Sequence, residues 1–465
     1  MEPMTVAEIL EAVNGTLLSE YPALDTAVSR LETDSRTIHP DSLFVPLIGE
    51  QFDGHAYIGA ALESGAAGCL TRRERESYLP GKFYIKVKDT RQALRDLARH
   101  YKKKFDIPVV AVTGSVGKTT TKDMVAAVLG EKYKVLKTEG NLNTDIGTCL
   151  TVFRLDRSYE AAVLEMGMNH AGEIEVISSI AEPDLCLITN VGESHIEFLG
   201  SRENILKAKA EIFSHAKPGG AAILNGDDEL LRTLEGKLER PIIWCGVKGN
   251  TAYSADHLVS NGTSGMSCEV KTPHSDFKVD IPALGSHMVY PTLMAAAVGE
   301  RFGLTAEEIC RGVAHFAPTK MRMNILQRQD GITILNDTYN ANPQSMRAAL
   351  EVLSQSRSKH KVAMLGDMLE LGPLAQALHA GIGEWAAKVG IDCLVCAGEL
   401  SEHIAAAAEA AGMKEVYWRP NKKEAMEVLR QVVKPDTTVL VKASRGMAFE
   451  ELVDYLVSIT EPAEG

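Results

Sequence analysis

The chain lacks long hydrophobic runs and has no excess of positive charge. No segment approaches the roughly 20 consecutive apolar residues that a membrane-spanning helix requires, so we expect no membrane insertion. The first residues, MEPMTVAEILEAVNG, lack the basic start and apolar stretch of a secretory signal, and we expect a cytoplasmic protein. Lys and Arg number 49 against 62 Asp and Glu, a net charge of −13, which argues against nucleic acid as a partner.

Cysteine is sparse, and the spacing of the cysteines does not indicate a set of disulfide bonds. Eight cysteines are scattered over 465 residues, which favours buried thiols in a reducing compartment over a set of disulfides. Cys393 and Cys396 form a CxxC pair, but no second pair follows at zinc spacing and DCLVCAG reads as a buried strand.

The chain of 465 residues is longer than one hydrophobic core usually organises, so we expect two or three domains.

Apolar strand candidates alternate with helical segments, which predicts an α/β fold with mostly parallel sheets. We expect three domains, at 1–100, 101–317 and 318–465. The second holds the strand candidates VVAVTG, AAVLEMG, DLCLITNVG and GGAAILNGDD, and a polar stretch at 250–280 predicts antiparallel strands added to its sheet. The third holds ITILND, KVAMLGD, DCLVCAG and TTVLVKAS.

The stretch VVAVTGSVGKTTTKDM, at 109–124, has the layout of a phosphate-binding loop. A strand runs into a glycine-containing turn, and backbone N–H groups at 114–118 would meet a phosphate at a helix N-terminus. Lys118 would reach the β- and γ-phosphates, and the Thr119 hydroxyl would face Mg²⁺. The full pattern has a glycine where this chain has Val112, so an ordinary strand–turn–helix remains open on this motif alone.

The next two strand candidates end in groups that could bind a metal or phosphate. Glu165 ends the run AAVLE, and Asn190, Glu193 and His195 follow DLCLIT. Open α/β sheets bind ligands at the carboxyl ends of their strands. A lone histidine is more often structural, but beside a phosphate loop and Glu165 a ligand role for His195 is favoured.

TGSVGKTT, GNLNTDIG, EMGMNHAGEI, TNVGESHIEFLGS and AKAEIF occur in the order seen in the Mur ligases, and the chain resembles that family over nearly its whole length. These are ATP-dependent amide-forming enzymes of peptidoglycan precursor synthesis, and their short phosphate loop tolerates Val112. The motifs DTYNANPQSM, LGDMLELG and KASRGM resemble the member that joins D-Ala-D-Ala to UDP-MurNAc-tripeptide.

The resemblance implies a UDP-sugar-binding α/β domain, a central P-loop ATPase-like parallel sheet and a Rossmann-like C-terminal domain that contacts nucleotide and D-Ala-D-Ala. It implies ATP and Mg²⁺ as cofactors, small-molecule substrates and a monomer. The implied catalytic residues are Lys118, Lys209 and His195. The implied ATP-binding residues are Gly114, Ser115, Val116, Gly117, Lys118, Thr119, Thr120, Asn141, Arg322 and Asp337. The implied Mg²⁺ ligands are Thr119, Glu165, His195 and Lys209 as a carbamate. The implied substrate-binding residues are Ser35, Arg36, Asp53, His55, Asn340 and Asn342.

Three other interpretations remain open. Another ligase of the same fold would add a different amino acid to a UDP-muramyl or folyl-glutamate acceptor. A P-loop GTPase would carry Asn-Lys-x-Asp after a strand, and the nearest match, NKKE at 421–424, lies in the third domain. A catalytically weakened homologue is suggested by Met288 and Pro291, which stand where the family carries asparagines near the adenine.

Overall fold

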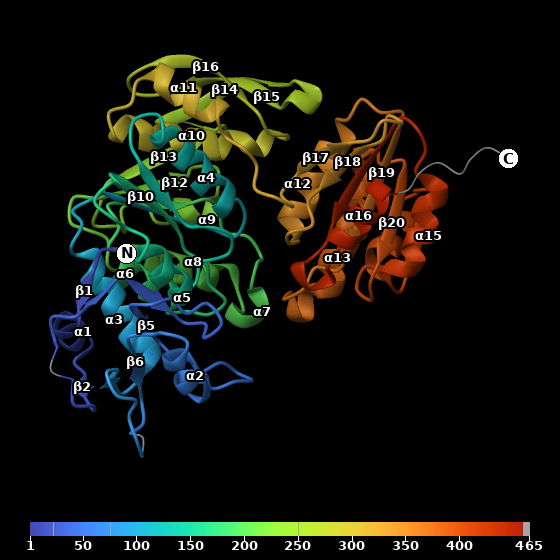
Figure 1. Ribbon diagram of the computed structural model, residues 1–465. Helices are drawn as coiled ribbons and strands as arrows, with labels where there is room; N and C mark the ends of the chain where they lie inside the picture. Colours follow the sequence, from blue (N-terminus) through green and yellow to red (C-terminus); the bar gives the residue numbers. More distant parts are fainter. Residues whose placement is uncertain (22, 75, 250, 459–465) are drawn as a thin grey trace.

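The computed structural model describes residues 1–21, 23–74, 76–249 and 251–458. Three α/β units follow one another along the chain, coloured blue, green to yellow, and orange to red in Figure 1. Each is built on its own main sheet, with five, nine and six strands. The predicted α/β class is confirmed.

The first unit holds β1 (Met4–Thr5), α1 (Val6–Val13), β2 (Thr16–Leu17), β3 (Ala27–Val28), β4 (Arg30–Glu32), β5 (Ser42–Phe44), α2 (Ile58–Glu63), β6 (Gly68–Thr71), β7 (Phe83–Lys86) and α3 (Thr90–Lys102). Its sheet has the order β2-β7-β6-β5-β4, and β2 alone of these strands is antiparallel to its neighbour. β1 and β3 form a separate antiparallel pair. α3 leads from this unit into the second.

The second unit holds β8 (Val109–Thr113), α4 (Lys118–Leu129), β9 (Val135–Lys137), α5 (Asp145–Val152), β10 (Ala161–Glu165), α6 (Glu173–Ala181), β11 (Leu185–Ile188), α7 (Ile196–Leu199), α8 (Arg202–Ala210), β12 (Ala221–Asn225), α9 (Glu229–Arg232), β13 (Ile242–Gly246), β14 (Tyr253–Ser260), β15 (Met266–Lys271), β16 (Asp276–Ile281), α10 (Val289–Arg301) and α11 (Ala306–Ala314). The strand order is β16-β15-β14-β13-β12-β11-β8-β10-β9. Strands β8 to β14 pair in parallel, and β14, β15 and β16 pair antiparallel, as predicted for 250–280.

The central strands are apolar without interruption because helices cover both faces of the sheet. Along β8, Val110 and Val112 join the core that includes α4 and α10, whereas Val109 and Ala111 join the core on the opposite face. This alternation follows from the two-residue period of a strand. The carboxyl ends of β8, β10 and β11 therefore come together at one edge, where the loops are free to carry function.

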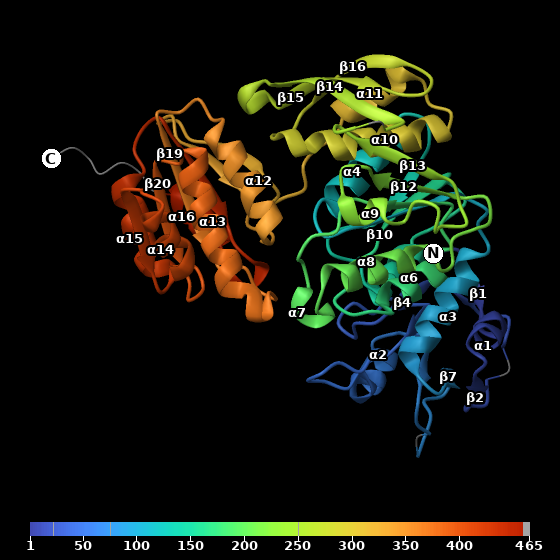
Figure 2. The same cartoon turned by 180° about the vertical axis from the view of Figure 1, so that it is seen from behind.

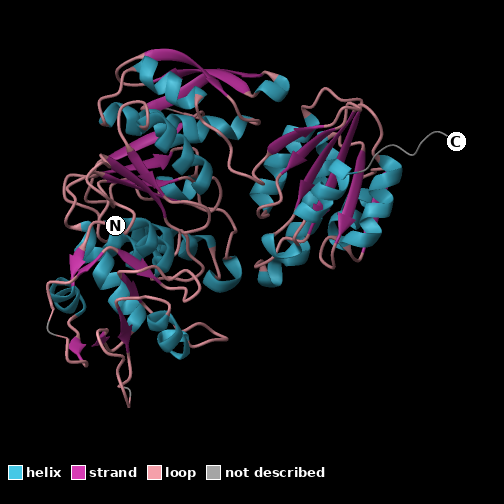
Figure 3. Ribbon diagram, viewed as in Figure 1, coloured by secondary structure: helices cyan, strands magenta, loops and turns pink. Residues whose placement is uncertain are grey.

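The third unit holds β17 (Asn324–Gln327), β18 (Thr333–Asn336), α12 (Pro343–Ser354), β19 (His360–Gly366), α13 (Ala375–Val389), β20 (Cys393–Ala397), α14 (Glu402–Ala410), β21 (Glu415–Arg419), α15 (Lys422–Val432), β22 (Thr437–Lys442) and α16 (Glu450–Ser458). Its order is β17-β18-β22-β19-β20-β21, parallel except for the edge strand β17, and helices flank the sheet (Figure 3). Cys393 and Cys396 are buried in β20 and join different core clusters, so the CxxC is a strand, as predicted.

An ion-pair cluster ties the first unit to the second. Asp145, at the start of α5, accepts hydrogen bonds from Arg91 and Arg95 of α3 at 2.6–2.9 Å. Burial alone would raise the pKa of Asp145, but these guanidinium groups outweigh it and lower the pKa from 3.8 to about 2. The carboxylate is therefore ionised throughout the neutral range.

Because the folded-state pKa of Asp145 is depressed, its contribution to stability is complete above pH 4 and is lost as the pH falls toward 2. We expect Asp145→Asn to lower the free energy of unfolding by about 2 kcal/mol at pH 7 and by about half as much at pH 3. Urea titrations at the two pH values measure this. Asp256→Asn, which removes an exposed ion pair with Lys271, should change the free energy of unfolding by less than about 0.5 kcal/mol. An equal loss for Asp145→Asn at both pH values would contradict the linkage.

None of the helices in the described ranges has the length and apolar character needed to cross a bilayer. The third unit follows α11 through the segment 315–323, and it also approaches the second unit at α7, as Figures 1 and 2 both show.

Candidate active site

The predicted phosphate loop lies between β8 and α4, in a turn that requires glycine at two positions. Gly114 has a φ of 152°, and a Cβ atom there would collide with the Thr189 hydroxyl. Gly117, with a φ of 83°, is the N-cap of α4. The loop therefore approaches the end of β11 more closely than any larger residue would allow.

Asn190, just after β11, fixes the first half of this loop. Its carbonyl accepts a hydrogen bond from the N–H of Ser115 (3.0 Å), and its side-chain oxygen accepts one from the N–H of Val116 (2.9 Å). In the described chain, the N–H groups of residues 117–120 have no hydrogen-bond acceptor. These four donors at the start of α4 form an anion cradle.

Lys118 adds a positive charge to the cradle. Its Nζ donates to the carbonyl of Gly114 at 2.8 Å. Desolvation lowers the pKa of Lys118, the nearby Glu165 opposes this shift, and Arg322 adds to it. Lys118 is therefore close enough to Glu165 of its own unit and to Arg322 of the third unit for their charges to affect its pKa.

Glu165, at the end of β10, is the buried acid beside the loop. It is 2% exposed, and its Oε1 accepts a hydrogen bond from the side-chain amide of Asn143 at 2.9 Å. Its Oε2 is buried and has no partner among the described residues, a costly state that a bound cation would relieve. Across the described ranges no three His, Cys, Asp or Glu side chains gather as a metal site. Mg²⁺ here would need further oxygen ligands from phosphate, water or a modified side chain.

His195 precedes α7 in a left-handed backbone conformation, with a φ of 63°. Its Nδ1 lies 2.7 Å from Oε2 of Glu370, a residue of the third unit, so the ring and the carboxylate are in close contact. This contact lowers the pKa of Glu370, against the opposing effect of burial. His195 therefore faces a carboxylate that remains ionised.

Lys209 lies in α8 and is only 1% exposed. Desolvation, with the charge of Lys118 second, lowers the pKa of Lys209 well below its usual range. No hydrogen bond or ion pair of its amine is found in the part of the chain that the structure describes. A lowered pKa raises the fraction of neutral amine, which is the form that can act as a nucleophile.

Arg322 and Asp337, on the third-unit side of the site, are each held in place by nearby residues of the chain. The Arg322 guanidinium stacks on the Tyr339 ring, 4.0 Å from its centroid. Asp337 accepts a hydrogen bond from Lys442 Nζ at 2.5 Å and another from the N–H of Met323 at 3.1 Å. Lys442 also lines the cavity, although nothing in the KASRGM motif by itself marks this lysine.

The two predicted asparagines lie close by. The Asn340 carbonyl accepts a hydrogen bond from Lys442 at 2.8 Å. Asn342 caps α12, and its amide donates to the Ser194 hydroxyl at 2.8 Å, across the contact between the units. A cavity of about 920 Å³ lies between the second and third units. Its lining includes Ser115, Val116, Gly117, Lys118, Thr119, Thr120, Glu165, His195, Arg322, Asp337, Asn340 and Asn342.

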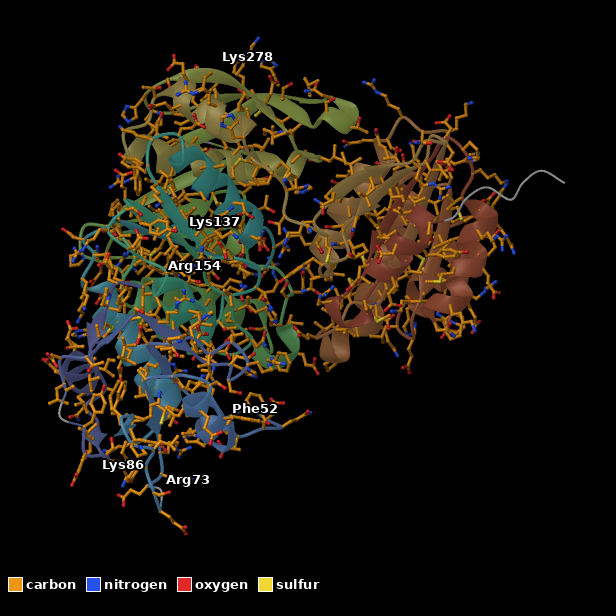
Figure 4. All side chains as sticks on the ribbon, in the orientation of Figure 1. Phe52, Arg73, Lys86, Lys137, Arg154 and Lys278 are labelled. Carbon is orange, nitrogen blue, oxygen red and sulfur yellow. The ribbon has the colours of Figure 1, made fainter. Side chains whose placement is uncertain are left out.

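The predicted UDP-sugar residues lie in the first unit and do not line this cavity. Ser35 and Arg36 follow β4, and Arg36 pairs with Asp34 at the surface. Asp53 contacts the ring of His55 at 2.7 Å. Phe52, directly before Asp53, is 58% exposed and projects from this unit (Figure 4). The exposed ring of Phe52 thus stands next to a pair of which the histidine is buried.

Asn141 also lies outside the cavity lining and is exposed, whereas Asn143 of the same GNLN motif lines the cavity and holds Glu165. Met288 and Pro291 line the cavity too. Pro291 is the third residue of α10, where its missing N–H costs no helical hydrogen bond. The chain therefore accommodates both departures from the family pattern without disturbing the helix.

A P-loop sheet whose cavity is lined by a further α/β unit is the architecture of a phosphate-binding enzyme. Family models described as "Mur ligase family, catalytic domain", "Mur ligase middle domain" and "Mur ligase, glutamate ligase domain" match residues 27–102, 112–299 and 321–445. The chain belongs to the Mur ligase family, and the predicted resemblance is confirmed.

Similar proteins span the whole chain. It is 39% identical to the UDP-N-acetylmuramoyl-tripeptide--D-alanyl-D-alanine ligase of Bacillus subtilis (strain 168), over 97% of this chain and 98% of the relative. A crystal structure of MurF from Acinetobacter baumannii aligns with a TM-score of 0.90 and 30% identity, over 99% of this chain and all of that one. MurF ligase from Thermotoga maritima in complex with ADP aligns with a TM-score of 0.83 and 28% identity, covering 92% and 97%.

Proposed function

We infer that this chain is an ATP-dependent ligase that joins D-alanyl-D-alanine to UDP-N-acetylmuramoyl-tripeptide in peptidoglycan precursor synthesis. Similarity over 97% of the chain to a ligase of that name carries the assignment. The cavity agrees with it, because a phosphate cradle and residues of the third unit line the same space. ATP is the cosubstrate, in keeping with the ADP complex of the Thermotoga maritima protein.

The reaction we propose has two steps. The acceptor carboxylate attacks the γ-phosphorus of ATP, which forms an acyl phosphate and releases ADP. The amine of D-alanyl-D-alanine then attacks the acyl carbon, loses a proton, and expels phosphate from a tetrahedral intermediate. Lys118 and the N–H groups of residues 117–120 would stabilise charge on the transferred phosphoryl group. Enclosure between the units would keep water from the acyl phosphate.

We propose that Thr119, Glu165 and His195 hold Mg²⁺, with Lys209 as a carbamate. The unpartnered Oε2 of Glu165 supports this assignment. A bound Mg²⁺ would neutralise charge on the phosphate oxygens.

The carbamate proposal depends on the state of the Lys209 amine. A neutral amine can attack CO₂ at carbon and lose one proton, which gives an anionic oxygen ligand. The burial of Lys209 and its lowered pKa favour the neutral amine that this step requires. Oxygen ligands of this kind suit Mg²⁺.

We propose for the remaining predicted residues the roles that the family resemblance implies. Gly114, Ser115, Val116, Gly117 and Thr120 form the phosphate loop, and Arg322 and Asp337 would contact the nucleotide across the cavity. The further candidates are Asn141 for ATP, Ser35, Arg36, Asp53 and His55 for the UDP-sugar, and Asn340 and Asn342 for the dipeptide. We propose domain limits near residues 100 and 317, a monomer, and a cytoplasmic location.

Phosphate release from ATP and Mg²⁺ with UDP-MurNAc-tripeptide tests the function. We expect release that depends on D-alanyl-D-alanine, with single amino acids and no amine as comparisons, and a product with the mass of the pentapeptide. Release with a single amino acid alone would point to another ligase of the same fold. No release from folded protein at high ATP would favour the catalytically weakened homologue.

A further inference from the structure

His195 and Glu370 meet at the contact between the second and third units. His195 stands before α7, and Glu370 lies in the loop after β19, just before the short 3₁₀ helix η5 (Gly372–Leu374). Besides the 2.7 Å contact of Nδ1 with Oε2, the N–H of Glu197 approaches the carbonyl of Glu370 at 3.4 Å. In Figures 1 and 2, α7 faces the lower end of the third unit at this point.

Both residues carry backbone strain. Their φ angles are 63° for His195 and 62° for Glu370, in the left-handed region that is unfavourable for a residue with a Cβ atom. Such conformations persist where surrounding contacts hold them, and they concentrate at functional sites. Here the hydrogen bond from Asn342 to Ser194 and the packing of Gly372 on Glu197 supply those contacts.

The ring of His195 lies between two cavities. It lines the large cavity together with Lys118 and Glu165, and it also lines a smaller cavity of about 120 Å³ together with Glu370 and Arg445. Glu370 occupies the Nδ1 side of the ring. No hydrogen-bond partner of Nε2 is found among the described residues. That nitrogen is therefore available to a ligand.

We propose that Glu370 is a positioning residue: its carboxylate, supplied by the third unit, holds the His195 ring so that Nε2 is presented to the metal. Metal-binding histidines usually have their other ring nitrogen held by a carboxylate, carbonyl or water, which fixes the ring and its tautomer. Because the two residues belong to different units, docking of the third unit is linked to metal binding. The inference rests on the metal site of the proposed function.

Mn²⁺ binding to the full chain, followed by electron paramagnetic resonance with a non-hydrolysable ATP analogue, tests this role without turnover. We expect Glu370→Gln to weaken Mn²⁺ binding by about 10-fold or more. Glu197→Gln removes a charge from the same interface but not from His195, and it should change the affinity less than about twofold. Thermal unfolding of each variant shows whether the fold is kept.

His195→Ala separates this inference from the proposed function. Loss of Mn²⁺ affinity in both His195→Ala and Glu370→Gln supports the positioning role. Loss in His195→Ala alone overturns the role of Glu370 and leaves the metal site intact, whereas no loss in either overturns the site and the inference together. Should Glu370→Gln fail to fold, Glu370→Asp, which is too short to keep the 2.7 Å contact, takes its place with the same loss expected.

Discussion

Replacing Lys118 by alanine is expected to lower the rate of ATP-dependent ligation by at least about 10³-fold. Its ammonium lies at the N-terminus of α4, beside four N–H groups without acceptors, and the cations whose charges act on it are Arg322 and Lys209. Arg322 is stacked on Tyr339, and Lys209 as a carbamate would carry negative charge, so neither replaces the ammonium of Lys118. Phosphate release in the complete assay measures the effect.

Lys237→Ala, at an exposed site of the second unit outside the cavity lining, is the control and should keep full activity. The loss in Lys118→Ala should appear in kcat as well as in kcat/KM, because the charge matters most where phosphoryl charge develops. Unimpaired ATP turnover in Lys118→Ala would remove the phosphate loop from the proposed site.

Replacing Lys209 by alanine is expected to lower activity by about 10²-fold or more, because the proposed carbamate oxygen is lost. Formate or acetate added to this variant should restore part of the activity, since each brings a carboxylate into the space that the side chain vacated. The measurement is the ligation rate of Lys209→Ala against the concentration of each acid.

Lys207→Ala is the matched control, because Lys207 lies on the same helix but is exposed. It should remain active and should not respond to the added acids. Full activity of Lys209→Ala without any acid would overturn the carbamate hypothesis. A low activity that no acid restores would favour a purely structural role for the buried lysine.

The phosphate loop could be predicted from the sequence because the residues that determine its shape are neighbours in the chain. A strand, two glycines with positive φ and a helix N-terminus follow one another within 109–124, and hydrogen bonding of neighbouring backbone groups fixes their shape. The strand candidates were equally readable, since parallel strands buried on both faces are continuous apolar runs. Glu165 and His195 were found because strand ends mark the functional edge of such a sheet.

Which side chains contact one another at the site could not be predicted from the sequence, because these contacts depend on how distant segments pack. GNLN contains two asparagines, and only the fold shows that Asn143, not Asn141, holds Glu165. The pairing of Asp337 with Lys442 joins residues 105 positions apart. Glu370 meets His195 from another unit, so no local pattern could have shown it.

The sequence by itself therefore determined the α/β class, the family resemblance and the phosphate loop, all of which rest on periodicity or on contiguous motifs. The tertiary structure alone decided which units face one another across the cavity and which carboxylate oxygen remains unpartnered. It also decided that Lys118 and Lys209 are desolvated enough for their pKa values to fall. The physical reason is that burial and charge–charge contact are set by the packing of segments far apart in the chain.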